Sequence, residues 1–229
     1  MKTLIIIPAY NEELNIERVV GNLVENYPQY DYVVVNDGSR DNTAKICREH
    51  GYNLLDLPVN LGLSGGFQAG MMYAYKNGYD FALQMDGDGQ HKPEYIQPLL
   101  DCAIETKANI VIGSRFVTEK KPKSFRMFGS NIISFIIKLT TGCRIADPTS
   151  GMRIFDKNAI KEYAININYC PEPDTIAFLL RTGMKCKEVQ VEMDERIAGE
   201  SYLNLKNSIK YMTKMIMSIL FIQWVRKRG

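Results

Sequence analysis

Two aspartates stand one residue apart in the segment QMDGDGQHKPE, which covers residues 84–94. Asp86 and Asp88 directly follow an apolar run, and two carboxylates so close together are unfavourable unless a cation neutralises them or one is protonated. A hard divalent ion such as Mg²⁺ or Mn²⁺ takes oxygen ligands and commonly links protein carboxylates to substrate phosphates. The pattern therefore indicates a clamp for a metal ion and a diphosphate. An EF-hand calcium loop is disfavoured, because its twelfth position needs a glutamate and here holds Gln97.

The chain around this segment alternates between two apolar patterns. Short β-branched runs bounded by Gly, Pro, Asn or Asp predict buried strands at residues 3–7, 32–35, 53–57, 81–85 and 110–112. Apolar residues at helical spacing predict helices over residues 14–27, 44–50, 63–74 and 93–106, with Leu14 and Leu63 on inward faces. This alternation is typical of an α/β fold with helices around a doubly wound, mostly parallel sheet.

Polar clusters follow three of the predicted strands. They are PAYNEE after the first strand, NDGSRD after the second and MDGDGQ after the fourth. Each taken singly has an ordinary reading as a turn, and residues 41–43 are also a plausible helix cap. In a doubly wound sheet, however, ligands bind beyond the carboxyl ends of the strands. We therefore expect the three clusters to meet in one crevice.

Composition narrows the class of protein. The chain has 229 residues, 45% of them hydrophobic and 24% charged, which suits an ordinary globular domain with a sizeable core. A formal charge of +2, with basic and acidic residues mixed along most of the chain, gives no support for nucleic acid as a partner. The five cysteines are spread without metal-ligand spacing, which favours reduced thiols in a cytoplasmic compartment, and the apolar start reads as a strand rather than a signal peptide.

Six motifs occur in an order and spacing that resembles inverting family 2 glycosyltransferases of GT-A fold. They are IPAYNEE, VVNDGSRDNT, NLGLSGGFQAG, QMDGDGQHKPE, IGSRF and DPTSGMRIF. Within that family the chain looks like dolichol-phosphate mannosyltransferases and bacterial polyprenyl-phosphate glycosyltransferases. The resemblance covers about residues 2–200. It implies a GT-A domain at residues 1–200, followed by a C-terminal segment at 201–229.

The resemblance also implies roles for matched residues. Those that would contact the nucleotide sugar donor are Pro8, Tyr10, Glu12, Asp37, Gly65, Gly66, Asp86, Gly87 and Asp88. Asp37 would accept a hydrogen bond from the base. The ligands of Mg²⁺ or Mn²⁺ would be Asp86, Asp88 and Gln90. We expect His91 to be partly exposed and not a ligand.

An acceptor phosphate would be bound by a second set of matched positions. These are Arg115, Arg126, Ser130 and Arg196. Arginine suits this task because its planar guanidinium binds phosphate oxygens bidentately and keeps its charge. For Arg115, at a predicted strand end, we favour this role over that of a solvated surface residue. Asp147 and Arg153 are expected to form a structural pair beside the site.

The segment YCPEPDTIAFLLRTG departs from the lipid-phosphate pattern. Glu172 and Asp174 stand where family 2 enzymes that glycosylate sugar hydroxyls carry an acidic pair, one of which is the general base. A hydroxyl acceptor must lose a proton and gains from such a carboxylate, whereas a phosphate is already anionic. The acids therefore leave the acceptor class open. Asp174 reads equally well as a helix cap.

The C-terminal segment predicts an amphipathic helix. Lys206, Lys210 and Lys214 recur on one stripe, and the apolar stretch from Met215 to Val225 is too short for a spanning helix, which needs ~20 residues. Trp224 and the basic run at residues 226–228 suit the surface of an anionic bilayer. We expect this helix to dock on a membrane surface or a small membrane-protein partner in preference to packing on the domain.

Together these patterns predict a metal-dependent inverting hexosyltransferase at the cytoplasmic membrane face, acting in cell-envelope glycan synthesis. Its donor would be a UDP-sugar rather than GDP-mannose, and its acceptor polyprenyl phosphate. Two alternatives remain. One is transfer to a sugar hydroxyl of a lipid-linked glycan, with Glu172 or Asp174 as base. The other is a catalytically silent nucleotide-sugar binding module that docks on a membrane partner.

Overall fold

A single mixed sheet organises the described part of the chain, which in this computed structural model comprises residues 1–166, 170–194, 205–222 and 224. The strand order is β3-β2-β1-β4-β6-β5-β7. The bounds are β1 Thr3–Ala9, β2 Asp31–Asp37, β3 Leu54–Leu57, β4 Phe81–Gln84, β5 Ile110–Ser114, β6 Arg153–Asp156 and β7 Cys186–Gln190. All five predicted strands are present, and the expected mostly parallel α/β sheet is confirmed.

The departure from parallel pairing comes from β6, which the sequence patterns did not predict. This strand runs antiparallel between β4 and β5, whereas β1, β2, β3 and β4 are parallel and β7 pairs parallel with β5. The strand RIFD is only four residues long and carries a charged residue at each end. Its two central apolar residues are too few to show a strand pattern in the sequence.

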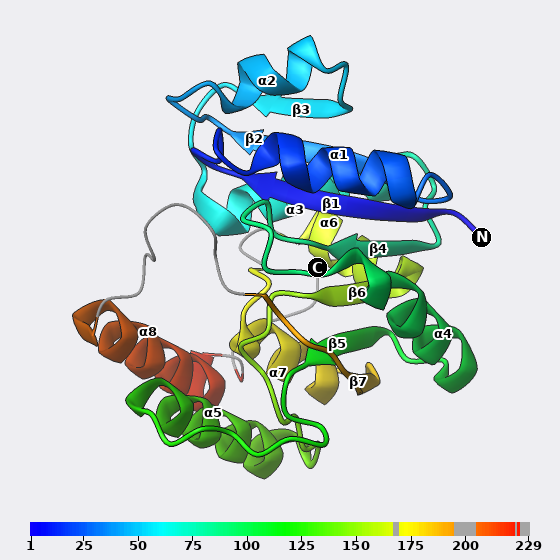
Figure 1. Cartoon of the computed structure of the whole chain (residues 1–229). Coiled ribbons are helices and arrows are strands. Elements are labelled where there is room, and N and C mark those ends of the chain that lie inside the picture. The colour runs from blue at the N-terminus through cyan, green and yellow to red at the C-terminus, as the bar shows by residue number, and fades with distance from the viewer. Residues whose placement is uncertain (167–169, 195–204, 223, 225–229) are drawn as a thin grey trace.

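Helices cover both faces of the sheet (Figure 1). Their bounds are α1 Ile16–Asn26, α2 Thr43–Glu49, α3 Gly62–Lys76, η1 Pro93–Tyr95, α4 Ile96–Thr106, α5 Phe125–Thr141, α6 Lys157–Ile165, α7 Pro173–Arg181, α8 Leu205–Met217 and η2 Ser218–Ile222. Strand side chains alternate between faces. In β1, Leu4 and Ile6 therefore join the core under α3, whereas Ile5 and Ile7 join the core under α1 and α4.

Two predicted inward-facing residues are on the surface instead. Leu14 is 73% exposed because α1 begins only at Ile16, and Leu63 is 55% exposed in the first turn of α3. The rest of each stripe packs as expected, with Val19 and Leu23 buried in α1 and Phe67 buried in α3.

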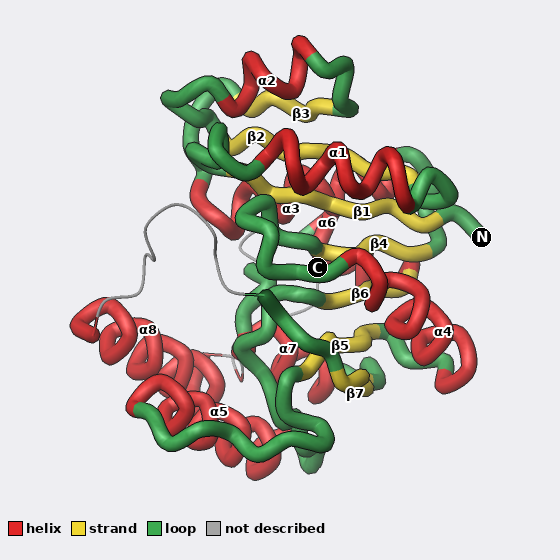
Figure 2. The backbone as a smooth tube through the Cα atoms, in the orientation of Figure 1, coloured by secondary structure: helices red, strands yellow, loops and turns green. Residues whose placement is uncertain are grey.

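The helices α5 and α8 pack side by side at one end of the molecule, away from β1 and β2 (Figure 2). The C-terminal amphipathic helix is confirmed, but one face packs on the domain, which was the less favoured expectation. Met215 and Ile219 are fully buried in the core shared with α5 and α7. Of the basic stripe, Lys210 and Lys214 are exposed on the outer side. The apolar surface that receives α8 exists only after α5 and α7 are folded.

Candidate active site

The loop after β1 is joined to the loop after β2 by a set of hydrogen bonds. The Asn11 N–H donates to Ser39 Oγ at 3.0 Å, and the Arg40 N–H donates back to Asn11 Oδ1 at 2.9 Å. The Glu12 N–H donates to Thr43 Oγ1 at 2.9 Å. Asn11 adopts φ 55°, a left-handed conformation that asparagine tolerates. The motifs PAYNEE and NDGSRD therefore form one wall, as the strand ends predicted.

Asp37 closes the second strand in a buried position. It is 4% exposed, and its Oδ1 accepts a hydrogen bond from the Leu61 N–H at 2.7 Å. A Cβ built on Gly66 of α3 would lie 3.5 Å from the Asp37 Cβ, so the start of α3 passes close to this residue. Gly65 neighbours this contact in the first turns of α3. The start of α3 and the end of β2 thus lie together, as expected of two parts of one donor pocket.

The loop after β4 carries the Asp-x-Asp pattern to the same place. A Cβ built on Gly87 would lie 3.2 Å from the Pro8 carbonyl oxygen and 3.7 Å from Glu12 Cγ. Tyr10, directly after the last residue of β1, is 43% exposed. The carboxyl ends of β1, β2 and β4 therefore lie together at one edge of the sheet.

The oxygen atoms of side chains in the loop after β4 suit a hard divalent cation as ligands. Asp86, Asp88 and Gln90 present oxygen atoms from partly exposed side chains. The Asp88 Oδ1 accepts from the Gln90 N–H at 3.0 Å, and Gly89 at φ 81° makes the turn between them. Within the described residues no cluster of three His, Cys, Asp or Glu could hold a metal ion. Two carboxylates and one amide oxygen nevertheless fit Mg²⁺ or Mn²⁺, which completes its coordination with waters and substrate phosphates.

His91 differs from the expectation of partial exposure. It is 6% exposed, its Nδ1 accepts a hydrogen bond from the Asp86 N–H at 2.9 Å, and its Nε2 lies 3.7 Å from Asp86 Oδ2. The backbone of His91 forms an antiparallel bridge with Met193, which carries a distant segment over the ring. That segment lies 102 residues away, so the burial could not be read from the local Lys-Pro sequence.

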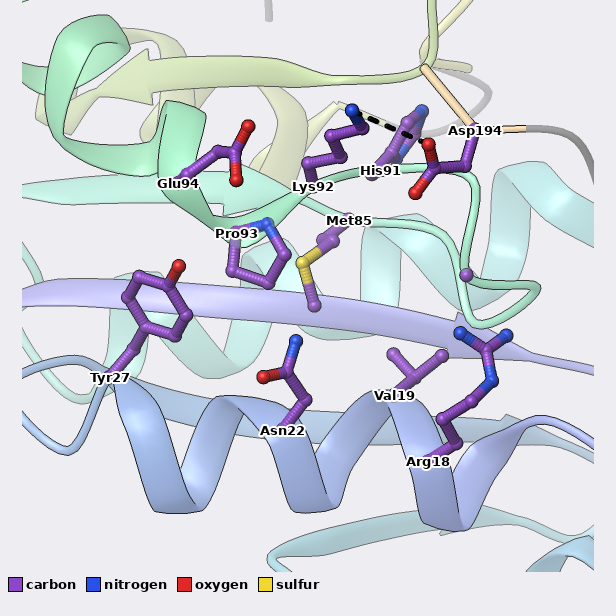
Figure 3. Close-up of a pocket in the computed structure, with 11 residues that line it drawn as sticks. Arg18, Val19, Asn22, Tyr27, Met85, His91, Lys92, Pro93, Glu94 and Asp194 are labelled. Carbon is purple, nitrogen blue, oxygen red and sulfur yellow. Dashed lines mark ion pairs between the residues drawn. The ribbon is translucent and has the colours of Figure 1, made fainter. Parts of the chain in front are cut away.

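An open pocket of about 440 Å³ lies between α1 and the segment after the Asp-x-Asp pattern. Figure 3 shows Arg18, Val19 and Asn22 rising from α1 toward Met85 and Pro93. On the side of the pocket opposite α1, Lys92 Nζ lies 3.4 Å from Asp194 Oδ1. Only the β4 loop and its continuation are shared with the predicted donor crevice.

Arg115 and Asp147 form a bidentate pair at the end of β5. Arg115 Nε donates to Asp147 Oδ2 at 2.7 Å, and Nη2 donates to Oδ1 at 3.0 Å. Asp147 is fully buried. The expected pair between Asp147 and Arg153 is therefore wrong. Arg153, 1% exposed, instead donates to the carbonyl oxygens of Pro148 and Pro171.

Lys121 is a candidate acceptor residue that the motifs did not single out. Its Nζ donates to Ser130 Oγ at 2.9 Å, and both Lys121 and Arg115 lie over the Phe116 ring, 5.6 and 5.2 Å from its centroid. Burial lowers the pKa of Lys121, and the charge of Arg115 adds to this effect. The basic run at residues 120–123 was the available signal. Arg115, Lys121 and Ser130 are thus brought together.

The remaining acceptor positions are only partly described. Arg126 lies in the first turn of α5, and its side chain is outside the described part of the structure. Arg196 lies entirely outside the described residues. Both assignments therefore stay predictions.

Glu172 and Asp174 contact the C-terminal helix. Glu172 Oε2 lies 3.5 Å from Lys214 Nζ, and the Ser218 hydroxyl donates to Asp174 Oδ2 at 2.6 Å. Burial raises the pKa of the Glu172 carboxyl, while Lys214 opposes this. Asp174 is not the helix cap that the sequence suggested. Glu172 occupies that position, and Asp174 lies in the first turn and accepts from the Thr175 N–H.

The mixed sheet with helices on both faces defines an α/β fold of GT-A type. The family described as Glycosyl transferase family 2 matches residues 4–164, and this chain belongs to that family. It is a family 2 glycosyltransferase.

Relatives of several kinds agree with this assignment. The polyprenol monophosphomannose synthase of Mycolicibacterium smegmatis is 29% identical over 93% of this chain and 85% of its own length. The undecaprenyl-phosphate mannosyltransferase of Micrococcus luteus is 31% identical over 89% and 88%. The UDP-N-acetylglucosamine–dolichyl-phosphate N-acetylglucosaminyltransferase of Methanococcus voltae is 36% identical over 69% and 70%.

A solved structure shares the fold. Glucosyl-3-phosphoglycerate synthase from Mycobacterium tuberculosis, in complex with Mn²⁺, UDP and phosphoglyceric acid, superposes with a TM-score of 0.70. The likeness covers 97% of this chain and 78% of that chain at 16% sequence identity, so it supports the fold alone.

Proposed function

We propose that this glycosyltransferase is metal-dependent and inverting, and that it moves a hexose from a UDP-sugar to polyprenyl phosphate. The observation that carries the proposal is that Pro8, Asp37 and Gly87, from three separate strand ends, lie at one edge of the sheet. By their names, one of the three relatives above makes polyprenol monophosphomannose and the other two act on undecaprenyl or dolichyl phosphate, one of them with a UDP-sugar.

The proposed chemistry is a single displacement. A phosphate oxygen of the acceptor forms a bond to the anomeric carbon as the bond from that carbon to the nucleoside diphosphate breaks, which inverts the configuration. Asp86, Asp88 and Gln90 would hold the divalent ion, whose charge stabilises the negative charge on the departing diphosphate. The chain's other task is to align donor and acceptor. Arg115, Lys121 and Ser130 lie together and suit binding of the acceptor phosphate.

A direct assay tests this reaction. The protein is incubated with UDP-glucose, UDP-N-acetylglucosamine or GDP-mannose, with and without Mn²⁺, and with polyprenyl phosphate in detergent. We expect a glycosyl lipid phosphate from a UDP-sugar only when the metal is present, with inverted anomeric configuration by NMR. Binding of donors without turnover on any acceptor would instead favour the silent binding module.

The contacts of Glu172 and Asp174 favour a phosphate over a hydroxyl acceptor. We expect the double variant Glu172→Gln/Asp174→Asn to keep its turnover number for polyprenyl phosphate within about threefold, because an anionic acceptor needs no general base. A hydroxyl transferase would lose about 10²- to 10⁴-fold. Single-turnover kinetics with saturating donor measures the difference.

Thermal unfolding across pH checks that the double variant is folded. The single variant Glu172→Gln tests the effect of the raised pKa of Glu172 on stability. Because the pKa of Glu172 is raised in the folded state, the folded protein binds the proton more tightly, and stability falls as pH rises above the ordinary carboxyl range of about 4.3. Glu172→Gln should therefore unfold at pH 7 at a temperature equal to or above that of the wild type. This advantage should disappear below pH ~4. Glu49→Gln, at an exposed site on α2, is the matched control.

The exposed apolar side chains of α5, η2 and residue 224 suit docking on an anionic bilayer. Five large apolar side chains on α5, η2 and residue 224 are between 57% and 69% exposed: Phe128, Phe135, Leu139, Phe221 and Trp224. Residues 125–141 and 205–229 contain Lys or Arg but no Asp or Glu. An apolar face within purely basic segments complements anionic lipid better than a neutral protein partner. Among the described helices, none has the length and hydropathy needed to cross a membrane.

Vesicle flotation tests this surface. We expect Phe135→Glu and Leu139→Glu each to weaken binding to vesicles of phosphatidylglycerol and phosphatidylcholine by about tenfold or more, because each loses ~1.5 kcal/mol or more of apolar burial. Val24→Glu on α1 is the control, since Val24 is also exposed but lies on another helix. Unchanged flotation of both α5 variants, or binding that is insensitive to phosphatidylglycerol, would contradict the assignment and favour a membrane-protein partner.

A further inference from the structure

The carboxylate of Asp86 has a buried side chain near each of its two oxygen atoms. On one side the Gln84 Nε2 donates to Asp86 Oδ1 at 3.1 Å, from a side chain that is 3% exposed. On the other side His91 Nε2 lies 3.7 Å from Asp86 Oδ2. The side chain of Asp86 is 37% exposed while that of His91 is 3% exposed. The Asp86 carboxylate is therefore partly exposed, whereas the Gln84 and His91 side chains beside it are buried.

The hydrogen bond at the other ring nitrogen defines the tautomer of His91. Nδ1 accepts from the Asp86 N–H at 2.9 Å, so this nitrogen carries no proton. The proton of the neutral ring is then on Nε2, the nitrogen that faces the Asp86 carboxylate. One imidazole thus contacts both the backbone and the side chain of the same aspartate.

The backbone around His91 keeps the ring in this orientation. The Asp194 N–H donates to the Gln90 carbonyl oxygen at 3.0 Å, next to the bridge between His91 and Met193. Gly151 lies close to both Asp86 and His91. A Cβ at this position would lie 2.7 Å from Asp86 Oδ2 and 3.1 Å from His91 Cε1. The absence of a side chain at Gly151 is what leaves room for the carboxylate and the ring to approach each other.

We infer that His91 and Gly151 are positioning residues that fix the Asp86 carboxylate for the divalent ion and the donor. The inference rests on the proposed function, and it assigns a role to His91 beyond that of a metal ligand or a solvent-facing loop residue. Partners that orient ligating groups typically change metal affinity about 10- to 100-fold when they are removed. The ring acts through Asp86 and does not itself contact the reacting atoms.

The two functions of the ring can be separated by substitution. His91→Asn keeps an acceptor near the Nδ1 position but has no N–H at the Nε2 position. His91→Gln places an amide N–H near the Nε2 position but loses the acceptor for the Asp86 N–H. We expect His91→Asn to unfold at nearly the wild-type temperature yet bind Mn²⁺ in the presence of UDP about 10- to 100-fold more weakly. His91→Gln should show the reverse pattern.

The measurement is Mn²⁺ binding by electron paramagnetic resonance at fixed UDP, together with thermal unfolding. His50→Ala, at the other and largely exposed histidine, should change neither quantity. Gly151→Ala, with His91 intact, should weaken Mn²⁺ binding because the new Cβ displaces the carboxylate. Wild-type Mn²⁺ affinity in His91→Asn, or losses of affinity that only follow losses of stability, would overturn the inference. A wild-type protein that binds no Mn²⁺ would instead contradict the proposed function.

Discussion

Asp88→Ala is expected to lower the rate of sugar transfer by about 10²- to 10³-fold, the scale on which enzymes lose a group that stabilises charge in the transition state. Asp88 stands between Gly87, which lies against Pro8, and Gly89, which makes the turn to Gln90. Under the proposed function its carboxylate would hold the ion that offsets charge on the departing diphosphate. Steady-state assays at several Mn²⁺ concentrations measure the loss, and added metal should restore only part of it.

The control for this variant is Asp101→Ala. Asp101 is an exposed carboxylate on α4, where it accepts from Gln97 within the same helix, so its removal changes net charge equally without touching the crevice. If Asp88→Ala transferred sugar at the rate of the control, the metal–diphosphate assignment would fail.

Arg115→Ala is expected to have two large effects. It removes a cation from the proposed acceptor site, and it leaves the fully buried Asp147 carboxylate without its bidentate partner. Breaking a buried ion pair from one side costs about 3–5 kcal/mol of folding free energy. Because a hydrogen bond to a charged group is worth ~1.5–3 kcal/mol, kcat/KM for polyprenyl phosphate should fall about 10- to 100-fold.

A second variant separates these effects. Arg115→Ala/Asp147→Asn removes the unpaired charge, so it should recover much of the lost stability in urea unfolding while acceptor kcat/KM stays low. Thr149, which donates to the same carboxylate, and Glu188, which accepts from the Asp147 N–H, remain to hold the loop. Recovery of acceptor kcat/KM together with stability would show that Arg115 is only structural.

Strand ends were the part of the site that sequence could predict. Apolar runs followed by Pro8, Asn36 and Met85 marked where three strands end, and parallel pairing brings such ends to one edge regardless of distance along the chain. The hydrogen bonds between the β1 and β2 loops follow from that arrangement. Local pattern and strand direction were sufficient for this half of the crevice.

The acceptor side depended on contacts between remote segments. Ser130 meets Lys121 from the first turns of α5, a helix that the sequence analysis did not predict. Arg153 was paired with Asp147 on proximity in sequence, yet β6 directs it into the interior toward two proline carbonyl oxygens. Such pairings depend on which loops the sheet brings together.

The sequence by itself predicted the first five strands, the four helices between them, the candidate oxygen ligands after β4 and the amphipathic character of the C-terminal helix, because each depends on residues close together in the chain. Only the tertiary structure decided that Arg115 pairs with Asp147, that His91 is buried against Asp86, and that Glu172 contacts α8 and Asp174 contacts η2. The physical reason is that burial and ion pairing depend on distances in space, and a single antiparallel strand, β6, changes those distances for every residue around it.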